Sequence, residues 1–229
     1  MASKWIAYNE LAWTVDWLAE PKEYEDEVMV YVNLIRQTAK EPPGTLLHLG
    51  SGAGGHDKIF RRYFSVTGAD LSSGMLNIAR VANPGIEYLE GDMRTLRLNR
   101  QFDAVAIPDS IDYMVSQYEL RQAVQTAALH LKTNGVLLLV AKTKETFQNR
   151  NFAYTGEKDG VHVTLFENNF INPVRPHAWE QVFRDAGLHM NKTQLTGIYD
   201  KYLLDGGEYP LTVYVGTKDP MFKSRKQEQ

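Results

Sequence analysis

The sequence predicts an α/β fold in which helices alternate with short apolar strands and cover both faces of a parallel sheet. Three observations carry this prediction. Five apolar strand patterns, separated by helical patterns or turns, succeed one another between residues 45 and 142. A glycine-rich stretch, "GSGAGG", directly follows the first of them. The last part of the chain changes pattern and ends in paired strands, which suits a sheet whose final strand runs antiparallel.

Composition limits the classes of protein to be considered. The chain has 229 residues, 43% of them hydrophobic and 23% charged, with a formal net charge of -3. These values fit one globular domain over residues 1–229 and make nucleic acid an unlikely partner, because nucleic-acid binders usually present a basic face. There is no cysteine, and we predict no metal site. Neither a signal peptide nor a membrane-spanning run is evident, so we expect a cytoplasmic protein with no membrane partner.

The N-terminal part, residues 1–40, is predicted to form a helical lid. A helical pattern covers residues 9–20, and Pro21 is expected to break it. A second pattern covers residues 23–40 before "EPPG" stops it.

The central part alternates strongly between the two periodicities. Because each strand is apolar throughout and is followed by a turn or an amphipathic helix, a parallel sheet buried on both faces is expected. The turn "TNG" is expected to end the last helix. The predicted strands cover 45–49, 65–70, 86–92, 102–110 and 136–142, and the helices cover 55–64, 72–82 and 116–132.

The remaining chain is predicted to differ from the central part. Residues 146–207 contain a hairpin over 151–171, turning at "GEKDG", and a helix over 176–188 that Gly187 ends. A last strand covers residues 208–217. We expect the 146–207 region to shape the pocket of a second ligand, since such regions vary freely on a shared scaffold.

The glycine-rich stretch fits two patterns at once. Gly50, Gly52 and Gly55 form G-x-G-x-x-G, the fingerprint of dinucleotide-binding domains. Gly50, Gly52 and Gly54 form G-x-G-x-G, the pattern of S-adenosylmethionine enzymes. Either way, glycines at the end of a strand allow a ligand to approach the backbone closely.

Polar side chains at the next strand ends suit an adenosine. Asp70 ends the second strand, where a carboxylate can accept hydrogen bonds from both ribose hydroxyls. Asp92 ends the third and can accept from an exocyclic adenine amine, while Leu71 and Met93 offer apolar faces to the ring. Taken singly, Asp70 and Asp92 could cap a helix or a turn. Their combination with the glycines favours ligand binding.

Four segments together, "LLHLGSGAG", "VTGADLSSGMLNIAR", "YLEGDM" and "FDAVAIPDSIDYM", resemble the class I S-adenosylmethionine-dependent methyltransferases over roughly residues 5–145. The pattern D-L-S-x-x-M-L-x-x-A-R and the leading Y-x-x-L-A resemble the branch that acts on small molecules. The resemblance implies a Rossmann-like, doubly wound seven-stranded sheet of order 3-2-1-4-5-7-6 with strand 7 antiparallel, N-terminal helices and a hairpin insertion after strand 5. It implies a cofactor-binding core over residues 45–145.

The resemblance also implies the ligands and the residues that meet them. S-adenosyl-L-methionine is the implied cofactor, and a nitrogen or oxygen atom of a small-molecule acceptor receives the methyl group. The implied cofactor-binding residues are Tyr8, His48, Gly50, Ser51, Gly52, Asp70, Leu71, Met75, Gly91, Asp92, Met93, Pro108 and Asp109. Methyl transfer chiefly needs alignment and desolvation, and a general base is needed only if the acceptor must first lose a proton. The catalytic candidates are Asp109, Tyr113 and His177.

One position departs from the family pattern. The family usually has an acidic residue two places before the first glycine, where this chain has His48. By resemblance, that acid helps to set the glycine loop and reaches the methionine amino group. Asp109 is a candidate for a compensating carboxylate.

Other functions stay open at this point. An NAD(P)-dependent oxidoreductase would explain the glycines, but the helical residues before the first strand count against it. A non-catalytic S-adenosylmethionine-binding protein would explain His48. A nucleic-acid methyltransferase is disfavoured because "IPDS" stands where an Asn/Asp-Pro-Pro-aromatic motif is expected. The oligomeric state is open, and a homodimer formed through the 150–170 hairpin is one option.

Overall fold

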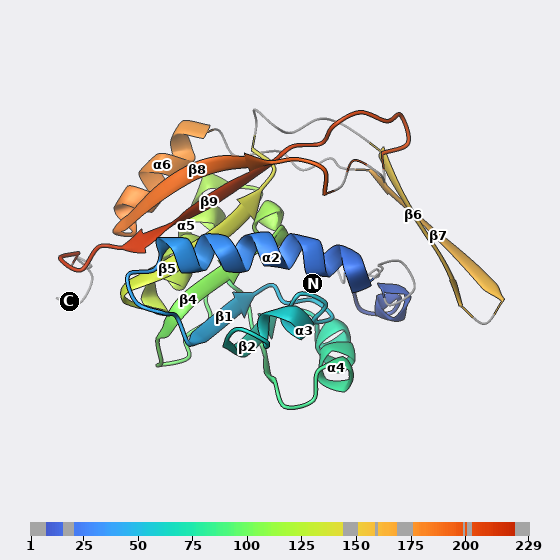
Figure 1. Cartoon of the computed structure of the whole chain (residues 1–229), viewed down its shortest axis with the longest axis horizontal. Helices are drawn as coiled ribbons and strands as arrows, with labels where there is room; N and C mark the ends of the chain where they lie inside the picture. Colours follow the sequence, from blue (N-terminus) through green and yellow to red (C-terminus); the bar gives the residue numbers. More distant parts are fainter. Residues whose placement is uncertain are drawn as a thin grey trace.

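The computed structural model describes residues 8–15, 21–143, 151–158, 160–168, 176–198, 200 and 203–222. A seven-stranded sheet forms its centre, and a separate two-stranded hairpin projects from one end of the molecule (Figure 1). The sheet strands are β1 (Thr45–Leu49), β2 (Ser65–Asp70), β3 (Glu87–Glu90), β4 (Phe102–Ile107), β5 (Leu131–Ala141), β8 (Leu188–Leu195) and β9 (Leu211–Lys218). The hairpin consists of β6 (Asn151–Lys158) and β7 (Val161–Asn168).

The strand order confirms the predicted topology. The order is β3-β2-β1-β4-β5-β9-β8, which is 3-2-1-4-5-7-6 when only the sheet strands are counted. Neighbouring strands from β3 to β5 pair in parallel, and β9 runs antiparallel to both β5 and β8. The carboxyl ends of β1 to β5 therefore meet at one edge, which is where open α/β sheets bind ligands.

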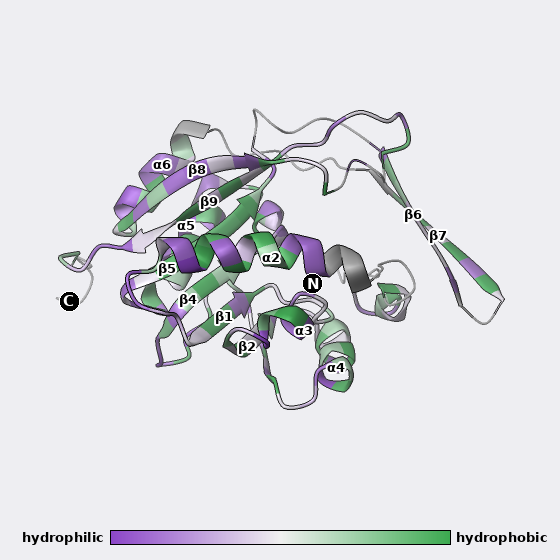
Figure 2. Ribbon diagram, viewed as in Figure 1, coloured by the Kyte–Doolittle hydropathy of each residue, from purple (hydrophilic) through white to green (hydrophobic). Residues whose placement is uncertain are grey.

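Helices cover both faces of the sheet and enclose two apolar cores. One face packs against α2 (Pro21–Thr38) and α3 (Asp57–Phe60), the other against α5 (Gln117–Leu129) and α6 (Pro176–Asp185). Figure 2 shows the hydrophobic strands between these layers. Because side chains alternate along a strand, Leu47 of β1 enters the α5 core whereas Leu46 enters the α2 core, and His48 lies on the same side as Leu46.

The ends of several elements differ from the prediction. Residues 9–14 form turns and a 3-10 helix, η2 (Ala12–Thr14), in place of the start of a helix over 9–20. Pro21 begins α2, since proline needs no hydrogen-bond acceptor in the first turn of a helix. The helix expected over 55–64 shortens to the four residues of α3.

The turn "TNG" does not end a helix. Helix α5 stops at Leu129, and β5 starts only two residues later, at Leu131. The three residues lie within β5, where the pairing with β4 shifts register and Asn134 takes a φ of 60°. An asparagine in this left-handed region fits a bulge as well as a helix end, which is why the local signal was ambiguous.

Within the described part of the chain, no helix combines the length and the apolar character needed to cross a membrane.

Candidate cofactor and active site

The backbone conformation of the glycine-rich loop after β1 shows which of the two glycine patterns the loop follows. Gly50, Gly52 and Gly54 have φ angles of 75°, 54° and 79°, in the region that favours glycine. Among the four loop glycines, all of them described, only Gly55 lacks a positive φ. The conformation therefore follows G-x-G-x-G.

The three loop glycines serve different purposes. A Cβ atom at Gly50 would lie 2.1 Å from the Ser110 Oγ, and one at Gly54 would lie 2.5 Å from the Asn83 Nδ2. These two glycines are needed because the protein's own atoms pack against them. A Cβ atom at Gly52 would meet nothing within 4 Å. The open space over Gly52 therefore fits a ligand that approaches the bare backbone.

Asp70 is held rigidly beside that space. One carboxylate oxygen accepts the Gly52 N–H at 2.8 Å, and the other accepts the Ser72 N–H at 2.8 Å. Ser72 in turn caps α4 (Ser73–Ala82) by accepting the Met75 N–H at 3.1 Å. The Asp70 side chain is partly exposed, and each oxygen keeps a further lone pair. It can therefore accept hydroxyl groups without reorganising.

Asp92 follows β3 and is engaged by a residue that the sequence analysis missed. The Arg94 Nε donates to the Asp92 Oδ1 at 3.0 Å and to its Oδ2 at 2.9 Å, and a terminal nitrogen of Arg94 donates to Oδ2 at 2.6 Å. The other terminal nitrogen of Arg94 donates to Glu119 at 2.7 Å. Burial raises the pKa of Asp92, but the Arg94 hydrogen bonds hold it below its ordinary value. Asp92 thus stays ionised, with a guanidinium attached to the place predicted for adenine.

The remaining predicted cofactor residues lie around this edge. The Leu71 side chain is 63% exposed, and the Met93 methyl carbon would be 3.1 Å from a Cβ atom at Gly50. Ser51, Met75 and Pro108 are buried, and the Gly91 N–H binds the Asp70 carbonyl oxygen at 2.9 Å.

A cluster of buried polar side chains lies on the α2 side of the loop. His48 pairs with Asp57 at 2.6 Å, and His56 pairs with Glu27 of α2 at 3.2 Å. The Tyr31 hydroxyl donates to the same Glu27 carboxylate at 2.6 Å. The sequence analysis missed Glu27 and Asp57 because their partners come from different elements. Among the described residues, no group of three or more acidic or histidine side chains is arranged to hold a metal ion.

Charges in this cluster compensate one another. Burial raises the pKa of Glu27, yet His56 and Tyr31 bring it below its ordinary value. Burial alone would lower the pKa of His56, but the Glu27 carboxylate, helped by two aspartates, leaves it raised. Both shifts favour the charged forms of the pair, which ties the loop to α2.

The end of β4 holds two carboxylates. Asp109 has a φ of 54°, a strained value for a residue other than glycine, which points to a functional constraint at this position. Asp112, in the 3-10 helix η3 (Ser110–Tyr113), is buried and accepts the Lys142 N–H at 3.0 Å. Burial and the charge of Asp109 raise the pKa of Asp112 to about 7, against the opposing effect of Lys142.

The N-terminal segment, residues 8–15, spans the same edge. The Tyr8 carbonyl oxygen accepts the Ser72 hydroxyl at 2.5 Å, and the Tyr8 hydroxyl contacts the Tyr113 hydroxyl. Ser72 follows β2 and Tyr113 follows β4, and β1 lies between these strands in the sheet. Tyr8 therefore connects the β2 end of this edge with the β4 end, on either side of β1. Tyr113, 40% exposed, joins the site here.

The structure does not test the candidate His177. It is the second residue of α6, and its side chain lies outside the described part of the structure.

Comparisons with known proteins agree with this geometry. Residues 46–135 match a family model described as "Methyltransferase domain". The dTDP-3-amino-3,4,6-trideoxy-alpha-D-glucopyranose N,N-dimethyltransferase of Streptomyces venezuelae is 35% identical over 125 residues, 54% of this chain and 52% of that protein. The dTDP-3-amino-3,6-dideoxy-alpha-D-glucopyranose N,N-dimethyltransferase of Streptomyces fradiae is 34% identical over 120 residues, 52% of this chain and 47% of that protein. The chain thus spans about half the length of the curated relatives it matches.

Solved structures share the whole architecture. Streptomyces venezuelae DesVI superposes with a TM-score of 0.71 at 26% identity, over 86% of this chain and 92% of that one. The S-adenosylmethionine-bound CalS10 of Micromonospora echinaspora, an amino pentose methyltransferase, superposes with a TM-score of 0.66 at 23% identity, over 85% and 91%. The latter likeness concerns the fold alone.

Proposed function

We propose that this chain is a methyltransferase of the class I S-adenosylmethionine-dependent fold and that it transfers a methyl group to the amino nitrogen of a small molecule. A nucleotide-linked amino sugar is the acceptor class we infer, because two relatives are named as N,N-dimethyltransferases of dTDP-amino sugars. Nitrogen is thereby favoured over oxygen. We place the activity in the cytoplasm, in keeping with a chain that has no cysteine.

One observation carries the cofactor assignment: open space over Gly52 stands beside an Asp70 carboxylate already fixed by two backbone N–H groups. An adenosine fits these two features, because its ribose hydroxyls can donate to the carboxylate and the rest of the molecule can pack closely against the bare backbone. Leu71 and Met93 would supply apolar surface for the ring, and Asp92, held by Arg94, is the candidate acceptor for the adenine amine.

When bound, S-adenosylmethionine supplies an electrophilic methyl group carried on a positively charged sulfur. The chain's own task is to align the acceptor and to exclude water. Tyr8 and Tyr113, joined across the edge, would orient the acceptor, and the N-terminal segment would cover it. An ammonium group must lose a proton before it can attack. Asp109 is the candidate proton acceptor, and His177 is a second candidate.

The first experiment is calorimetric titration with S-adenosylmethionine, S-adenosylhomocysteine and NADH in parallel. Micromolar binding of the two adenosyl ligands and none of NADH is expected. Mass spectrometry would then follow methylation of a dTDP-linked 3-amino sugar and of its 3-hydroxy counterpart, of which only the amine should gain mass. Binding of NADH alone would overturn the proposal, and methylation of the hydroxyl compound would overturn the choice of nitrogen.

Asp70→Ala tests the cofactor residue directly. The change removes a charged acceptor from two ribose hydroxyls, each bond worth about 1.5–3 kcal/mol, so S-adenosylmethionine should bind at least tenfold more weakly. Asp26→Ala, which removes an exposed carboxylate from α2, is the matched control and should leave affinity unchanged. Equal affinity in the two variants would contradict the role of Asp70.

A further inference from the structure

His48 and Asp57 face each other across the two ends of the glycine loop. His48 lies two residues before Gly50, and Asp57 begins α3, directly after the loop. Their contact joins Nδ1 to Oδ1 at 2.6 Å, and the two side chains are 2% and 0% exposed. A single short hydrogen bond thus closes a loop of eight residues, 49–56, inside the protein.

The remaining polar atoms of this pair are buried as well. The His48 Nε2 and the Asp57 Oδ2 have no hydrogen-bond partner among the described residues. Because unpaired polar atoms are costly inside a protein, the Nδ1–Oδ1 hydrogen bond is the contact that compensates both side chains for their burial. The Asp57 carboxylate is the negative end of the pair.

Aromatic side chains surround the His48 ring and the Asp57 carboxylate. Rings of His56 and Phe60 lie 5.9 Å and 5.8 Å from the His48 ring, between centroids. The Tyr88 phenol lies close to Asp57 on the other side, and burial together with that carboxylate raises its pKa. Asp57 also contributes to the raised pKa of His56. His48 is therefore the ring that holds Asp57 in place from the strand side.

The conformation of the glycine loop depends on contacts that hold it in place. Three of its glycines take positive φ angles, and glycine loses more conformational entropy on ordering than any other residue. Bonds from Gly50 and Ser51 to the Ala69 carbonyl oxygen and from Gly52 to the Asp70 carboxylate hold the loop to β2, and a bond from Asn83 to the Gly54 carbonyl oxygen holds it to α4. The Ser110 hydroxyl donates to the Leu49 carbonyl oxygen, and the His56–Glu27 pair connects the loop to α2. Among the described side-chain hydrogen bonds, His48–Asp57 is the one that joins the two residues flanking the loop.

We propose that His48 and Asp57 act as one positioning unit that holds the glycine loop in its ligand-binding shape. The proposal rests on the proposed function for the identity of the ligand. In this unit the imidazole stands at position 48 and the carboxylate at position 57, so the acidic group lies at the start of α3 and not at the end of β1. His48 is then a working part of the site.

This arrangement makes an unusual prediction for His48→Asp. Placing an acid at position 48 would set two buried carboxylates against each other, and one would have to stay protonated. We expect a lower melting temperature and at least tenfold weaker binding of S-adenosylmethionine. His48→Asn keeps a donor close to the position of Nδ1 and should stay within about threefold of the parent protein.

The decisive variant exchanges the partners, His48→Asp together with Asp57→His. If the two residues act as a unit, the exchange should restore most of the melting temperature and affinity lost in His48→Asp. A rise in KM for S-adenosylmethionine without a change in kcat marks positioning, which general destabilisation would not produce. Tighter binding by His48→Asp, or no recovery in the exchanged variant, would overturn the proposal.

Two measurements do not need the ligand. Imidazole nitrogen NMR of the parent protein should show the His48 Nδ1 protonated, as the donor to Asp57, and an unprotonated Nδ1 would overturn the proposal. Hydrogen exchange of the Gly50, Gly52 and Gly54 amides should be faster in Asp57→Asn than in the parent protein. If the parent protein binds neither adenosyl ligand, the proposed function fails, whereas unchanged exchange in Asp57→Asn contradicts the positioning unit alone.

Discussion

The glycine loop and the β6–β7 hairpin differ in how firmly the rest of the protein holds them. At the loop, side chains are short or absent and the backbone is bound at close intervals, by Ala69, Asp70 and Asn83. At the hairpin, only the root is anchored: Phe152 is 2% exposed and its ring stacks edge-on against Tyr209 at 5.0 Å. The rest projects from the molecule (Figure 1).

The hairpin leaves apolar side chains in water. Val161, Leu165 and Phe166 are 51%, 40% and 68% exposed, and alternation along β7 puts Val161 and Leu165 on one face. An isolated two-stranded hairpin is at best marginally stable in water. The conformation of the loop is therefore determined by contacts within the fold. The role of the hairpin depends instead on the molecule that its exposed apolar side chains contact.

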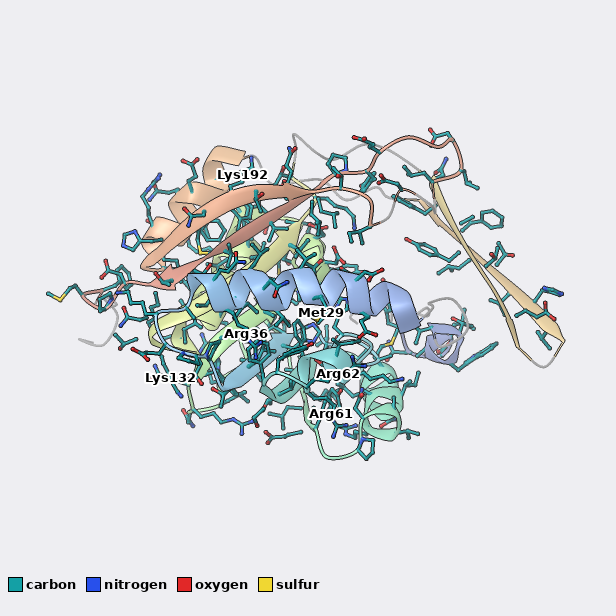
Figure 3. All side chains as sticks on the ribbon, viewed as in Figure 1. Met29, Arg36, Arg61, Arg62, Lys132 and Lys192 are labelled. Atoms are coloured by element: carbon teal, nitrogen blue, oxygen red, sulfur yellow. The ribbon has the colours of Figure 1, made fainter. Side chains whose placement is uncertain are left out.

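Two kinds of ion pair occur near the glycine loop, and they differ in burial. Figure 3 shows Arg61 and Arg62 near α3, below α2, and Arg62 donates to Glu25 of α2 at 2.6 Å. This ion pair is exposed, so it adds little stability. The buried pairs below the loop, by contrast, decide its conformation.

The largest effect that would test this contrast is expected from Gly50→Ala. Its Cβ would collide with Ser110 in a left-handed backbone, so we expect a loss of about 4 kcal/mol in the free energy of unfolding. Gly52→Ala meets no protein atom and should cost about 1 kcal/mol in strain, yet weaken S-adenosylmethionine binding more than tenfold. Denaturant titration and calorimetry would measure both.

Gly197→Ala is the control for these loop variants. Gly197 also has a positive φ, 86°, and open space around its Cβ position, but it lies outside the loop. It should share the strain of Gly52→Ala and bind the cofactor normally. Weakened binding in this control would show that strain alone explains the result.

A smaller effect, on pH dependence, is expected from Asp112→Asn. Since the folded-state pKa of Asp112 is about 7 and its ordinary value is 3.8, the folded protein holds the proton more tightly. Its free energy of unfolding should therefore fall as the pH rises from about 4 to 7, by roughly 3 kcal/mol or less from this group. Asparagine cannot titrate, so the difference between the parent protein and the variant should follow that slope. A difference independent of pH would contradict it.

An effect on affinity alone is expected from Gly74→Ala. Alanine favours helix α4 by about 1 kcal/mol, but its Cβ would lie 2.9 Å from the Asn9 Cα and carbonyl oxygen. The N-terminal segment should be displaced while the fold is kept. We expect an unchanged or higher melting temperature and about tenfold weaker cofactor binding, or ~1.4 kcal/mol. Ser73→Ala, at an exposed neighbouring position, should change neither.

The smallest effect is expected in the hairpin. Phe166→Ser should change the free energy of unfolding by about 0.5 kcal/mol or less, as for other exposed positions, and leave cofactor affinity unchanged. We propose that the 146–207 region shapes the acceptor pocket, so the KM for the acceptor is the parameter to follow. Weaker cofactor binding by Phe166→Ser would show that the hairpin, like the loop, takes part in cofactor binding.

Most of the central fold could be read from the chain because its signals are local. The strands over 45–49 and 65–70 and the glycine after α6 each depend on residues within a few positions, and the structure has all three. The strand order and the antiparallel last strand are likewise as predicted. The "TNG" turn was misjudged because asparagine and glycine fit a bulge as well as a helix end.

The sequence by itself determined the parallel sheet, the glycine loop at the end of β1 and the position of Asp70. These follow from hydrophobic periodicity and from the bare backbone that only glycine offers. Only the tertiary structure decided that Gly54 and not Gly55 completes the pattern, and that Asp57 stands opposite His48. The reason is physical: a buried polar side chain takes the partner that folding brings within hydrogen-bond distance, and the order of residues along the chain does not reveal that partner.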